Sequence, residues 1–170
     1  VLEVEANWKL LFENFSECFH CPQVHPELCA VVPIYGEGLL SDRQRDEGAM
    51  LGEFGPEFVS MGGETMYRRH ELAPGMVTFT MDGTTNRPFL PGLTDDQRSD
   101  PYTVMLVRPR LFINLHPDYV HTHRMLPIGP TRVQMTYEWL FEPSTMERDD
   151  FDVEQAVALW DITNRQDARN

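Results

Sequence analysis

The sequence is short of positive charge. It has 14 lysine and arginine residues against 27 aspartate and glutamate residues, which gives a formal net charge of −13 at pH 7. Nucleic acids and anionic membrane surfaces attract basic proteins, because their phosphates bind Lys and Arg. The acidic balance therefore argues against both kinds of partner.

Cysteines and long apolar runs are also scarce. The three cysteines are clustered rather than spread as a disulfide framework, which predicts unpaired thiols in a reducing, cytoplasmic setting. No apolar run reaches transmembrane length, and no signal peptide or internal repeat is found. The length of 170 residues and the hydrophobic content of 41% predict one domain, residues 1–170, with its own core. Because the chain lacks an initiator Met and stops within an apparent helix, we expect it to be part of a longer protein.

The residues with the most chemistry lie between 13 and 29, ENFSECFHCPQVHPELC. The preceding segment, residues 7–20, predicts an amphipathic helix that Pro22 ends, since proline cannot continue the hydrogen-bond ladder. His25 then lies just beyond the kink and can turn back toward His20. The expected aromatic face is Trp8, Phe12, Phe15 and Phe19, and the polar stripe beside it is Asn14, Glu17 and His20.

Three interpretations of this segment remain open. The two histidines are ordinary polar residues at a helix end, or they belong to a metal site. A structural zinc site would use the C-x2-C-x3-H-x3-C pattern, although two of its cysteines fall in an apolar helix. A catalytic iron would use His20, His25 and a carboxylate from a distant part of the chain, as in the facial triad of non-haem Fe(II) oxygenases. The zinc pattern is Cys18, Cys21, His25 and Cys29.

The middle of the chain predicts an antiparallel sheet. Four strand-length segments lie between residues 102 and 143, divided by turn residues and without intervening helices. Residues 75–83 predict a further strand with Val77, Phe79 and Met81 on one face. The loops 36–60 and 83–101 show no periodicity, and we expect them to shape a ligand pocket.

His116, His121 and His123 suggest a second metal site, because H-x-H on a strand places both rings on one face. The same alternation describes an ordinary solvated or cross-strand face. No matching acid lies nearby in the sequence, so we favour the ordinary face.

The last segment predicts a helix from a capping box at Ser144 and Glu147 to about residue 170. Its inward stripe ends in a carboxylate, Asp167, which needs a cation partner if it is buried. A salt bridge to an arginine of the sheet would also satisfy it. Asp152 and Asp161 are poorer candidates, because they lie in the first turn and beside the stripe. The stripe is Val153, Ala156, Val157, Trp160, Asn164 and Asp167.

These motifs resemble a known family. The opening NWKLLFENFSECFHCPQVHPEL resembles the catalytic-domain signature of Rieske non-haem iron oxygenase α subunits, N-W-K-x(3)-E-N-x(2)-[DE]-x(2)-H-x(4)-H. The ending ALWDITNRQDARN is similar to their C-terminal iron-ligand helix. The resemblance covers essentially the whole chain and implies an α+β helix-grip fold of the START/Bet v1 kind. In that fold an antiparallel sheet wraps around long helices, and the mononuclear iron lies between them.

The resemblance also implies roles for individual residues. His20, His25 and Asp167 match the Fe(II) ligands. Glu17 matches the acid through which electrons pass from a Rieske cluster, and Asn14 matches a residue that lines the iron site. Glu at the bridging position is similar to the branch that acts on quaternary ammonium compounds, whereas ring-dihydroxylating members usually carry Asp. Both an aromatic and a quaternary ammonium substrate remain candidates.

The combination of a C-x-H and a C-x2-H pair that holds a Rieske [2Fe–2S] cluster is absent from the sequence. The resemblance therefore implies an N-terminal Rieske domain outside this chain and a homotrimer in which a neighbouring subunit supplies electrons. A reductase or ferredoxin would deliver them from NAD(P)H. The implied reaction is the O2-dependent hydroxylation or oxidative demethylation of a small molecule. The alternative is a ligand-binding module of helix-grip fold, or a zinc site, without oxygenase activity.

Overall fold

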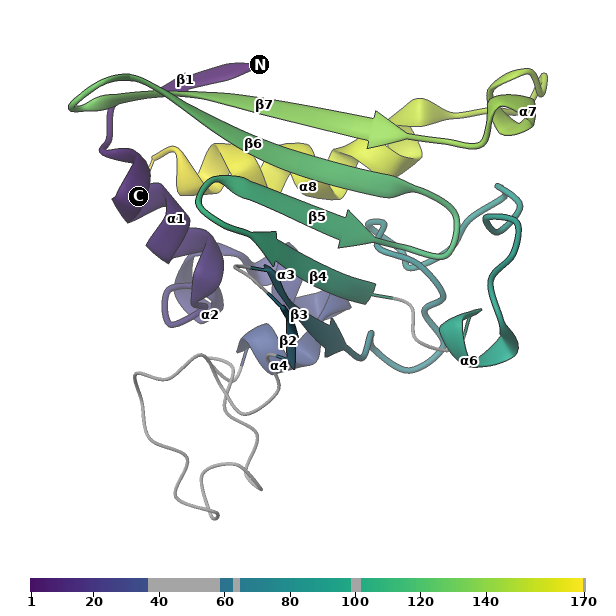
Figure 1. Ribbon diagram of the computed structural model, residues 1–170. Helices are drawn as coiled ribbons and strands as arrows, with labels where there is room; N and C mark the ends of the chain where they lie inside the picture. Colours follow the sequence, from purple (N-terminus) through teal and green to yellow (C-terminus); the bar gives the residue numbers. More distant parts are fainter. Residues whose placement is uncertain (37–58, 63–64, 99–101, 170) are drawn as a thin grey trace, which may run out of the picture.

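One antiparallel sheet organises the molecule (Figure 1). The computed structural model describes residues 1–36, 59–62, 65–98 and 102–169. Seven strands lie in the order β1-β7-β6-β5-β4-β3-β2, and every neighbouring pair is antiparallel. The strands are β1 (Leu2–Val4), β2 (Val59–Gly62), β3 (Thr65–His70), β4 (Tyr102–Val107), β5 (Leu111–Leu115), β6 (Val120–Gly129) and β7 (Arg132–Leu140).

The helices bring the two ends of the chain together. Figure 1 shows α8 running behind β6 and β7, with its C-terminal end beside α1. The helices are α1 (Trp8–Ser16), α2 (Cys21–Val24), α3 (Pro26–Val31), α4 (Pro33–Gly36), α6 (Asp95–Arg98), α7 (Pro143–Met146) and α8 (Val153–Asp167). The first helix of the chain, α1, thus lies beside the C-terminal end of the longest helix, α8.

The sheet confirms the expected α+β fold. The four predicted strands after residue 101 form the meander β4 to β7, and alternate residues on each strand face the helices. The inner face of β7 begins with Val133 and Met135, which are fully buried, as the alternation predicted. β1 was not predicted, because a strand of three residues is too short to show a period.

The strand predicted over residues 75–83 is wrong. This segment is irregular, and the backbone N–H groups of Val77 and Thr78 both donate to the carbonyl of Gly83. Phe79 is fully buried, but Val77 and Met81 are 43% and 47% exposed. The apparent alternation thus came from a turn that inserts one aromatic ring into the core. The predicted loop over 36–60 lies mostly outside the described residues.

The helix predicted from Ser144 to the end divides in two. α7 ends at Met146, and α8 begins at Val153 after Asp152, whose side chain accepts the N–H of Glu154. Asp152 is therefore the N-cap of the long helix, and the capping box proposed at Ser144 does not start it. The inward stripe is confirmed at Ala156, Trp160 and Asn164, which are buried, whereas Val157 is half-buried and Val153 is exposed.

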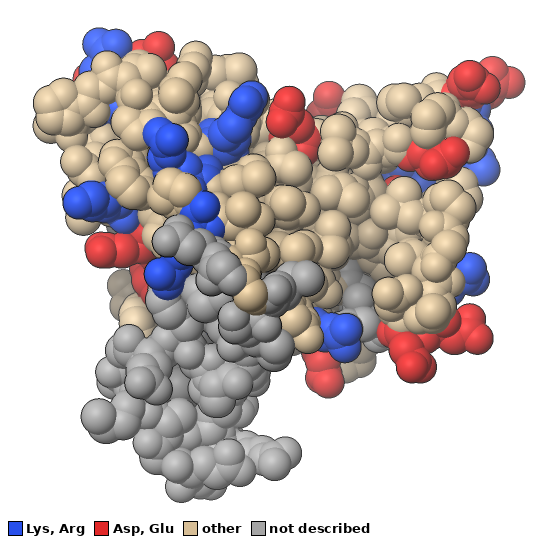
Figure 2. Space-filling model, in the orientation of Figure 1, with Lys and Arg blue, Asp and Glu red and all other residues tan. Residues whose placement is uncertain are grey.

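Charge is spread unevenly over the visible face of the molecule. In Figure 2, which has the orientation of Figure 1, most of the lysine and arginine gathers over the left part of this face, and acids lie along its upper edge, right rim and lower edge. The centre of the face carries little charge. Among the described residues, no helix is long and apolar enough to cross a membrane.

Candidate metal centre

The loop after α1 begins the site. α1 ends at Ser16, whose hydroxyl donates to the carbonyl of Phe12 at 2.6 Å, so the helix predicted over residues 7–20 is too long. Glu17 is extended, and its Oε2 accepts the N–H of Phe19. Phe19 is 59% exposed and does not belong to the aromatic face assigned to it. Glu17 thus folds the chain back on itself immediately before the first histidine.

Two prolines lie at the starts of helices, and each follows a histidine closely in the sequence. Pro22 lies in the first turn of α2, and Pro26 lies in the first turn of α3. Proline suits this position, because the first N–H groups of a helix have no partner within it. His20 and His25 are therefore the residues that precede the two helices, which fixes their backbones. The prediction that Pro22 ends a helix is wrong, because Pro22 lies at the start of one. The two histidines nevertheless face one another across a bend, as predicted.

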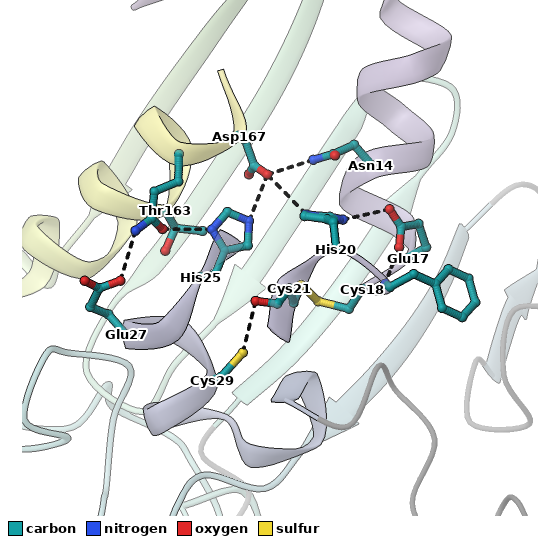
Figure 3. A network of polar contacts seen from close by, with 12 residues as sticks. Asn14, Glu17, Cys18, His20, Cys21, His25, Glu27, Cys29, Thr163 and Asp167 are labelled. Carbon is teal, nitrogen blue, oxygen red and sulfur yellow. Dashed lines mark hydrogen bonds and ion pairs between the residues drawn. A yellow bond between two sulfur atoms is a disulfide. The ribbon is translucent and has the colours of Figure 1, made fainter. Parts of the chain in front are cut away.

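Three side chains converge on one carboxylate oxygen (Figure 3). Oδ1 of Asp167 lies 2.9 Å from Nε2 of His25 and 3.3 Å from Nε2 of His20. It also accepts a hydrogen bond from Nδ2 of Asn14 at 2.9 Å. The structure therefore brings together residues from α1, from the loops before α2 and α3, and from the end of α8. Among the described residues, the ion-pair partners of Asp167 are these two histidines, so the salt bridge to an arginine of the sheet is not supported.

In each imidazole ring, the nitrogen that does not face Asp167 lies within hydrogen-bond distance of an oxygen acceptor. Nδ1 of His20 lies 2.8 Å from Oε1 of Glu17, and Nδ1 of His25 lies 2.8 Å from Oε1 of Gln166. The amide of Gln166 is oriented by Glu27, whose carboxylate accepts its Nε2 at 2.9 Å. Because both acceptors need a donor, Nδ1 carries the proton in each ring. The Nε2 atoms of both rings are then left with lone pairs.

With both rings protonated on Nδ1, the three groups that meet at Asp167 are all electron donors. Two imidazole lone pairs and one carboxylate oxygen meet at a single point, and they repel one another unless a proton or a cation lies among them. Two imidazolium rings would also repel, since the ring centroids of His20 and His25 are 5.1 Å apart. Donors bound at right angles to an ion by bonds of about 2.1 Å lie about 3.0 Å apart. The observed separations of 2.9 and 3.3 Å from Asp167 fit one metal ion.

The protonation equilibria reflect the same contacts. Burial raises the pKa of Asp167, but its contacts with Nε2 of His20, Nε2 of His25 and Nδ2 of Asn14 outweigh burial and lower the pKa to about 2. In its protonated form His20 donates Nε2–H to Asp167, which raises the pKa of His20 despite its partial burial, and Glu17 adds to this effect. The carboxylate is thus ionised and its surroundings favour positive charge, as a divalent cation requires.

The sulfur atoms do not form the zinc pattern. Cys18 and Cys21 are joined by a disulfide, so the prediction of unpaired cysteines is wrong for this pair. A nitrogen of His20, a nitrogen of His25 and Sγ of Cys21 lie within 4.8 Å of one another, but a disulfide sulfur offers no thiolate to a metal. Cys29 remains a thiol and donates to the carbonyl of Cys21 at 3.4 Å. Asp167 is the better third donor.

The histidines of the sheet are buried, so of the two expected alternatives the solvated face is wrong and the cross-strand face is confirmed, with His121 opposite Trp139 and His123 opposite Tyr137. His116, His121 and His123 are at most 3% exposed and pack among aromatic rings. The centroid of His121 lies 4.1 Å from that of Trp160, and Nε2 of His123 lies 3.0 Å from Nδ1 of His121. Burial lowers the pKa of His123 to about 3. His121 and His123 are thus neutral parts of the core.

A cavity of about 70 Å³ adjoins the three converging side chains. It lies between the inner face of the sheet and the ends of α1 and α8, and most of its walls are aromatic or aliphatic. A minority of polar groups faces it from β3, β4, β5 and α4. Its apolar wall includes Phe15, Phe79, Val104, Phe112 and Trp160, and its polar wall includes Tyr35, Arg68, Tyr102 and Asn114.

Sequence reasoning missed Gln166 and Glu27, which orient His25. Gln166 precedes Asp167 on α8, and Glu27 follows His25 in the first turn of α3. Their positions next to predicted ligands were a usable signal, because metal-binding histidines almost always donate their second N–H to an acceptor.

The family comparison agrees with the sequence resemblance. The model for the ring hydroxylating alpha subunit (catalytic domain) matches residues 1–170. The glycine betaine monooxygenase oxygenase subunit of Chromohalobacter salexigens is 27% identical over 175 residues, which covers 96% of this chain and 38% of that protein. The protein of the same description from Pseudomonas aeruginosa is 28% identical over 173 residues, covering 96% and 40%. The chain thus spans about two fifths of the length of these relatives.

Solved structures share the fold. The quaternary ammonium Rieske monooxygenase CntA in complex with an inhibitor has a TM-score of 0.56 at 14% identity, over 99% of this chain and 35% of that one. Naphthalene 1,2-dioxygenase from Rhodococcus sp. bound to indole has a TM-score of 0.53 at 15% identity, over 99% and 40%. At such identities the likeness shows the arrangement of the sheet and helices alone.

Proposed function

The chain belongs to the family of ring-hydroxylating α subunits, whose members are oxidoreductases, and on this premise we propose that it binds Fe(II) as the catalytic domain of a Rieske-type oxygenase. Residues 1–170 would form the iron domain of a longer protein, whose Rieske domain carries the [2Fe–2S] cluster. The reaction would convert R–H, O2, two electrons and two protons into R–OH and water. If the hydroxylated methyl group is bonded to nitrogen, it would leave as formaldehyde.

One observation carries the iron assignment. His20 and His25 each have Nδ1 turned to an acceptor, so both direct an Nε2 lone pair at Oδ1 of Asp167. We propose that these three residues are the metal ligands. When bound, Fe(II) held by two imidazoles and one carboxylate supplies the reductive activation of O2. The protein keeps the rings and the carboxylate in place before the metal arrives.

Two further residues would serve the same site. Glu17 accepts Nδ1–H of His20, which fixes the orientation of that ligand, and its carboxylate is a third exposed, so it can also face a neighbouring subunit. We propose that it forms the electron path from the cluster of that subunit in a homotrimer, supplied by a reductase or ferredoxin from NAD(P)H. Asn14 donates to Asp167 and would hold the carboxylate in its ligating orientation.

Two substrate classes fit the cavity wall. Aromatic faces can pack against a neutral ring or attract a trimethylammonium group, at about 0.5–2 kcal/mol for each cation–π contact. We favour the cationic class, because the bridging acid is Glu17 and because two relatives are described as glycine betaine monooxygenase subunits. Tight binding of neutral aromatics with no binding of betaines would contradict this choice.

Metal analysis of the intact protein after anaerobic purification tests the site. We expect stoichiometric Fe(II) in the wild type and none in Asp167→Ala, because the carboxylate ligand is lost. Asp161→Ala is the matched control, since Asp161 lies on the exposed side of the same helix and pairs with Arg165. Asp152→Ala, which removes a helix cap, controls for stability.

The same measurement addresses the zinc alternative. Tightly bound zinc that is lost in Cys18→Ser would support a cysteine site, and iron retained at full occupancy in Asp167→Ala would overturn our ligand assignment. We expect Cys18→Ser to retain iron, because neither cysteine of the disulfide is among the proposed ligands.

A further inference from the structure

The disulfide lies against the two proposed histidine ligands. Cys18 comes shortly before His20 in the sequence, Cys21 follows it directly, and both cysteines line the cavity beside the proposed iron site. Both are at most 5% exposed. In Figure 3 the carboxylate of Asp167 lies above the rings of His20 and His25, and the disulfide lies below them. The two rings thus lie between two kinds of donor, a carboxylate oxygen and a pair of sulfur atoms.

The sulfur of Cys21 is close enough to the rings to become a metal ligand. A nitrogen of His20, a nitrogen of His25 and Sγ of Cys21 lie within 4.8 Å of one another. Donors of a tetrahedral zinc ion, bound at about 2.3 Å through sulfur and about 2.1 Å through nitrogen, lie about 3.6 Å apart. Sγ of Cys21 would therefore need to approach the rings by about 1 Å, a shift that rotation of its side chain provides.

The S–S bond prevents this rotation, because it fixes the positions of both sulfur atoms. The backbone of Cys21 has contacts of its own, since its N–H donates to the carbonyl of Cys18 at 3.2 Å and its carbonyl accepts the N–H of His25 at 2.9 Å. The thiol of Cys29 donates to the same carbonyl at 3.4 Å. Opening the S–S bond thus frees the side chain of Cys21 without releasing the loop that carries the histidines.

We propose that the disulfide between Cys18 and Cys21 controls which metal the two histidines prefer. After its reduction, the thiolate of Cys21 replaces Asp167 as the third ligand, and added Zn²⁺ displaces Fe(II). Thiolate and imidazole donors favour tetrahedral zinc, whereas imidazole and carboxylate donors with open positions favour Fe(II). This inference rests on the proposed function, because it uses the same two histidines.

The redox step balances with a dithiol as the reductant. The dithiol delivers two electrons and two protons, the S–S bond of the protein breaks, two thiols form, and the dithiol itself becomes a disulfide. Zinc binding then releases the thiol proton of Cys21 to solvent, because the thiolate is the ligand. A disulfide oxidant reverses these steps and leaves Asp167 as the third donor.

X-ray absorption at the zinc edge of the intact protein tests this site, because it reports the neighbours of zinc and not those of iron. The protein is loaded with Zn²⁺ after oxidation with diamide or after reduction with a phosphine, and alkylation followed by mass measurement verifies the state of the cysteines. We expect nitrogen and oxygen neighbours at about 2.0–2.2 Å in the oxidised protein and an additional sulfur neighbour at about 2.3 Å in the reduced protein. Reduction should also raise the zinc affinity, measured by competition with a chelator, by at least about tenfold.

Four variants separate Cys21 from the other donors. Cys18→Ser leaves Cys21 as a thiol, so the sulfur neighbour should be present without a reductant, and until zinc is added this variant keeps all three proposed iron ligands. Cys21→Ser should show no sulfur neighbour in either state. Cys29→Ser is the matched control, since it removes the thiol outside the disulfide, and it should behave like the wild type. Reduced Asp167→Ala should still bind zinc through sulfur, although it binds no iron.

A reduced wild type without a zinc–sulfur bond, a Cys21→Ser variant that keeps one, or loss of zinc from reduced Asp167→Ala would overturn the proposal. If Cys21→Ser does not fold, the comparison of oxidised and reduced wild type still decides the question. Failure of the proposed function looks different: an oxidised protein without iron that forms a zinc–sulfur bond after reduction would contradict the iron assignment and support this site. Iron in the oxidised protein and no zinc–sulfur bond after reduction would do the reverse.

Discussion

The protein buries two groups of histidines in opposite surroundings. Nδ1 of His20 and Nδ1 of His25 face oxygen acceptors, and both Nε2 atoms face the carboxylate of Asp167. His121 and His123 instead face one another and the rings of tryptophan and tyrosine residues. Nε2 of His121 and Nδ1 of His123 have no hydrogen-bond partner in the described part of the chain. The surroundings of the first pair suit the proposed cation, and those of the second pair are aromatic core.

The difference shows that histidine spacing alone does not define a metal site. H-x-H on a strand places His121 and His123 on one face, yet burial lowers the pKa of each ring, and the two rings contact each other. His20 and His25, five positions apart, are proposed as ligands because the oxygens of Glu17 and Gln166 orient both rings toward Asp167. What distinguishes the pairs is the set of acceptors behind the rings.

The largest effect should come from removing the acid behind His20. In Glu17→Gln the three proposed ligands survive, so iron should stay bound with at most a roughly 10–100-fold loss of affinity. Turnover of the intact enzyme should nonetheless collapse, because the charge on the electron path is lost. After a single reduction of the cluster, stopped-flow oxidation with substrate and O2 would show the block.

Glu13→Gln is the matched control for this prediction. Glu13 is one turn earlier on α1 and exposed, so its removal should leave cluster reoxidation unchanged. Reoxidation of the Glu17→Gln cluster at the wild-type rate would mean that Glu17 is not the bridge.

The sequence predicted those helices and strands whose hydrophobic pattern repeats strictly or over many residues. The four-strand meander and the inward stripe of α8 have enough repeats to show their faces. The helix bounds near Pro22 and Ser144 were wrong because local contacts decided them. Ser16 bonds back to Phe12, and Asp152 caps α8. Such contacts leave little trace in a hydrophobic pattern.

The residues of the candidate site could be predicted where they belong to one sequence motif. Residues that only the tertiary structure brings together could not. His20 and His25 could be paired from their spacing, and the inward stripe of the last helix pointed to Asp167, which the family resemblance then matched to a ligand. The position of Gln166 beside Asp167 was a signal that went unused. The place of Arg68 in the cavity wall could not be predicted, since it depends on how β3 approaches the loops after α1. Whether the sheet histidines were exposed also depended on tertiary packing, because alternation alone does not say what covers a face.

A second effect concerns the stability of the aromatic histidine pair. The folded pKa of His123 is about 3 because burial disfavours its charged form, although Asp167 raises it in part. In the unfolded chain the pKa is about 6.5, so the unfolded state takes up a proton below this pH and the folded state does not. Stability from this residue is therefore complete above about pH 6.5 and falls as the pH drops toward 3. From pH 7 to pH 5 the loss should be about 2 kcal/mol.

Urea unfolding of His123→Phe at pH 7, 6 and 5 isolates this term. Phenylalanine keeps an aromatic ring and removes the titrating group, so the variant should lose less stability on acidification than the wild type. Tyr137→Phe is the control, because Tyr137 contacts the same ring at a centroid distance of 5.1 Å and does not titrate in this range. Equal pH slopes in His123→Phe and the wild type would show that this histidine is not held neutral by burial.

The smallest effect should come from the acceptor behind His25. Gln166→Met keeps the length of the side chain but leaves Nδ1 of His25 without its acceptor at 2.8 Å. The ring can then change tautomer or rotate, which directs its lone pair away from Asp167 for part of the time. Fe(II) affinity, measured by competition with a chelator, should fall by about 10-fold, the lower end of the range for such partners.

Glu27→Gln should reduce the Fe(II) affinity less, because Gln166 keeps its contact with His25 even when Glu27 no longer orients its amide. Arg165→Gln changes the neighbouring residue, which pairs with Asp161 on the exposed face, and should bind iron like the wild type. Wild-type affinity in Gln166→Met would mean that Asp167 alone orients His25, and that the acceptors behind the rings do not distinguish the two histidine pairs.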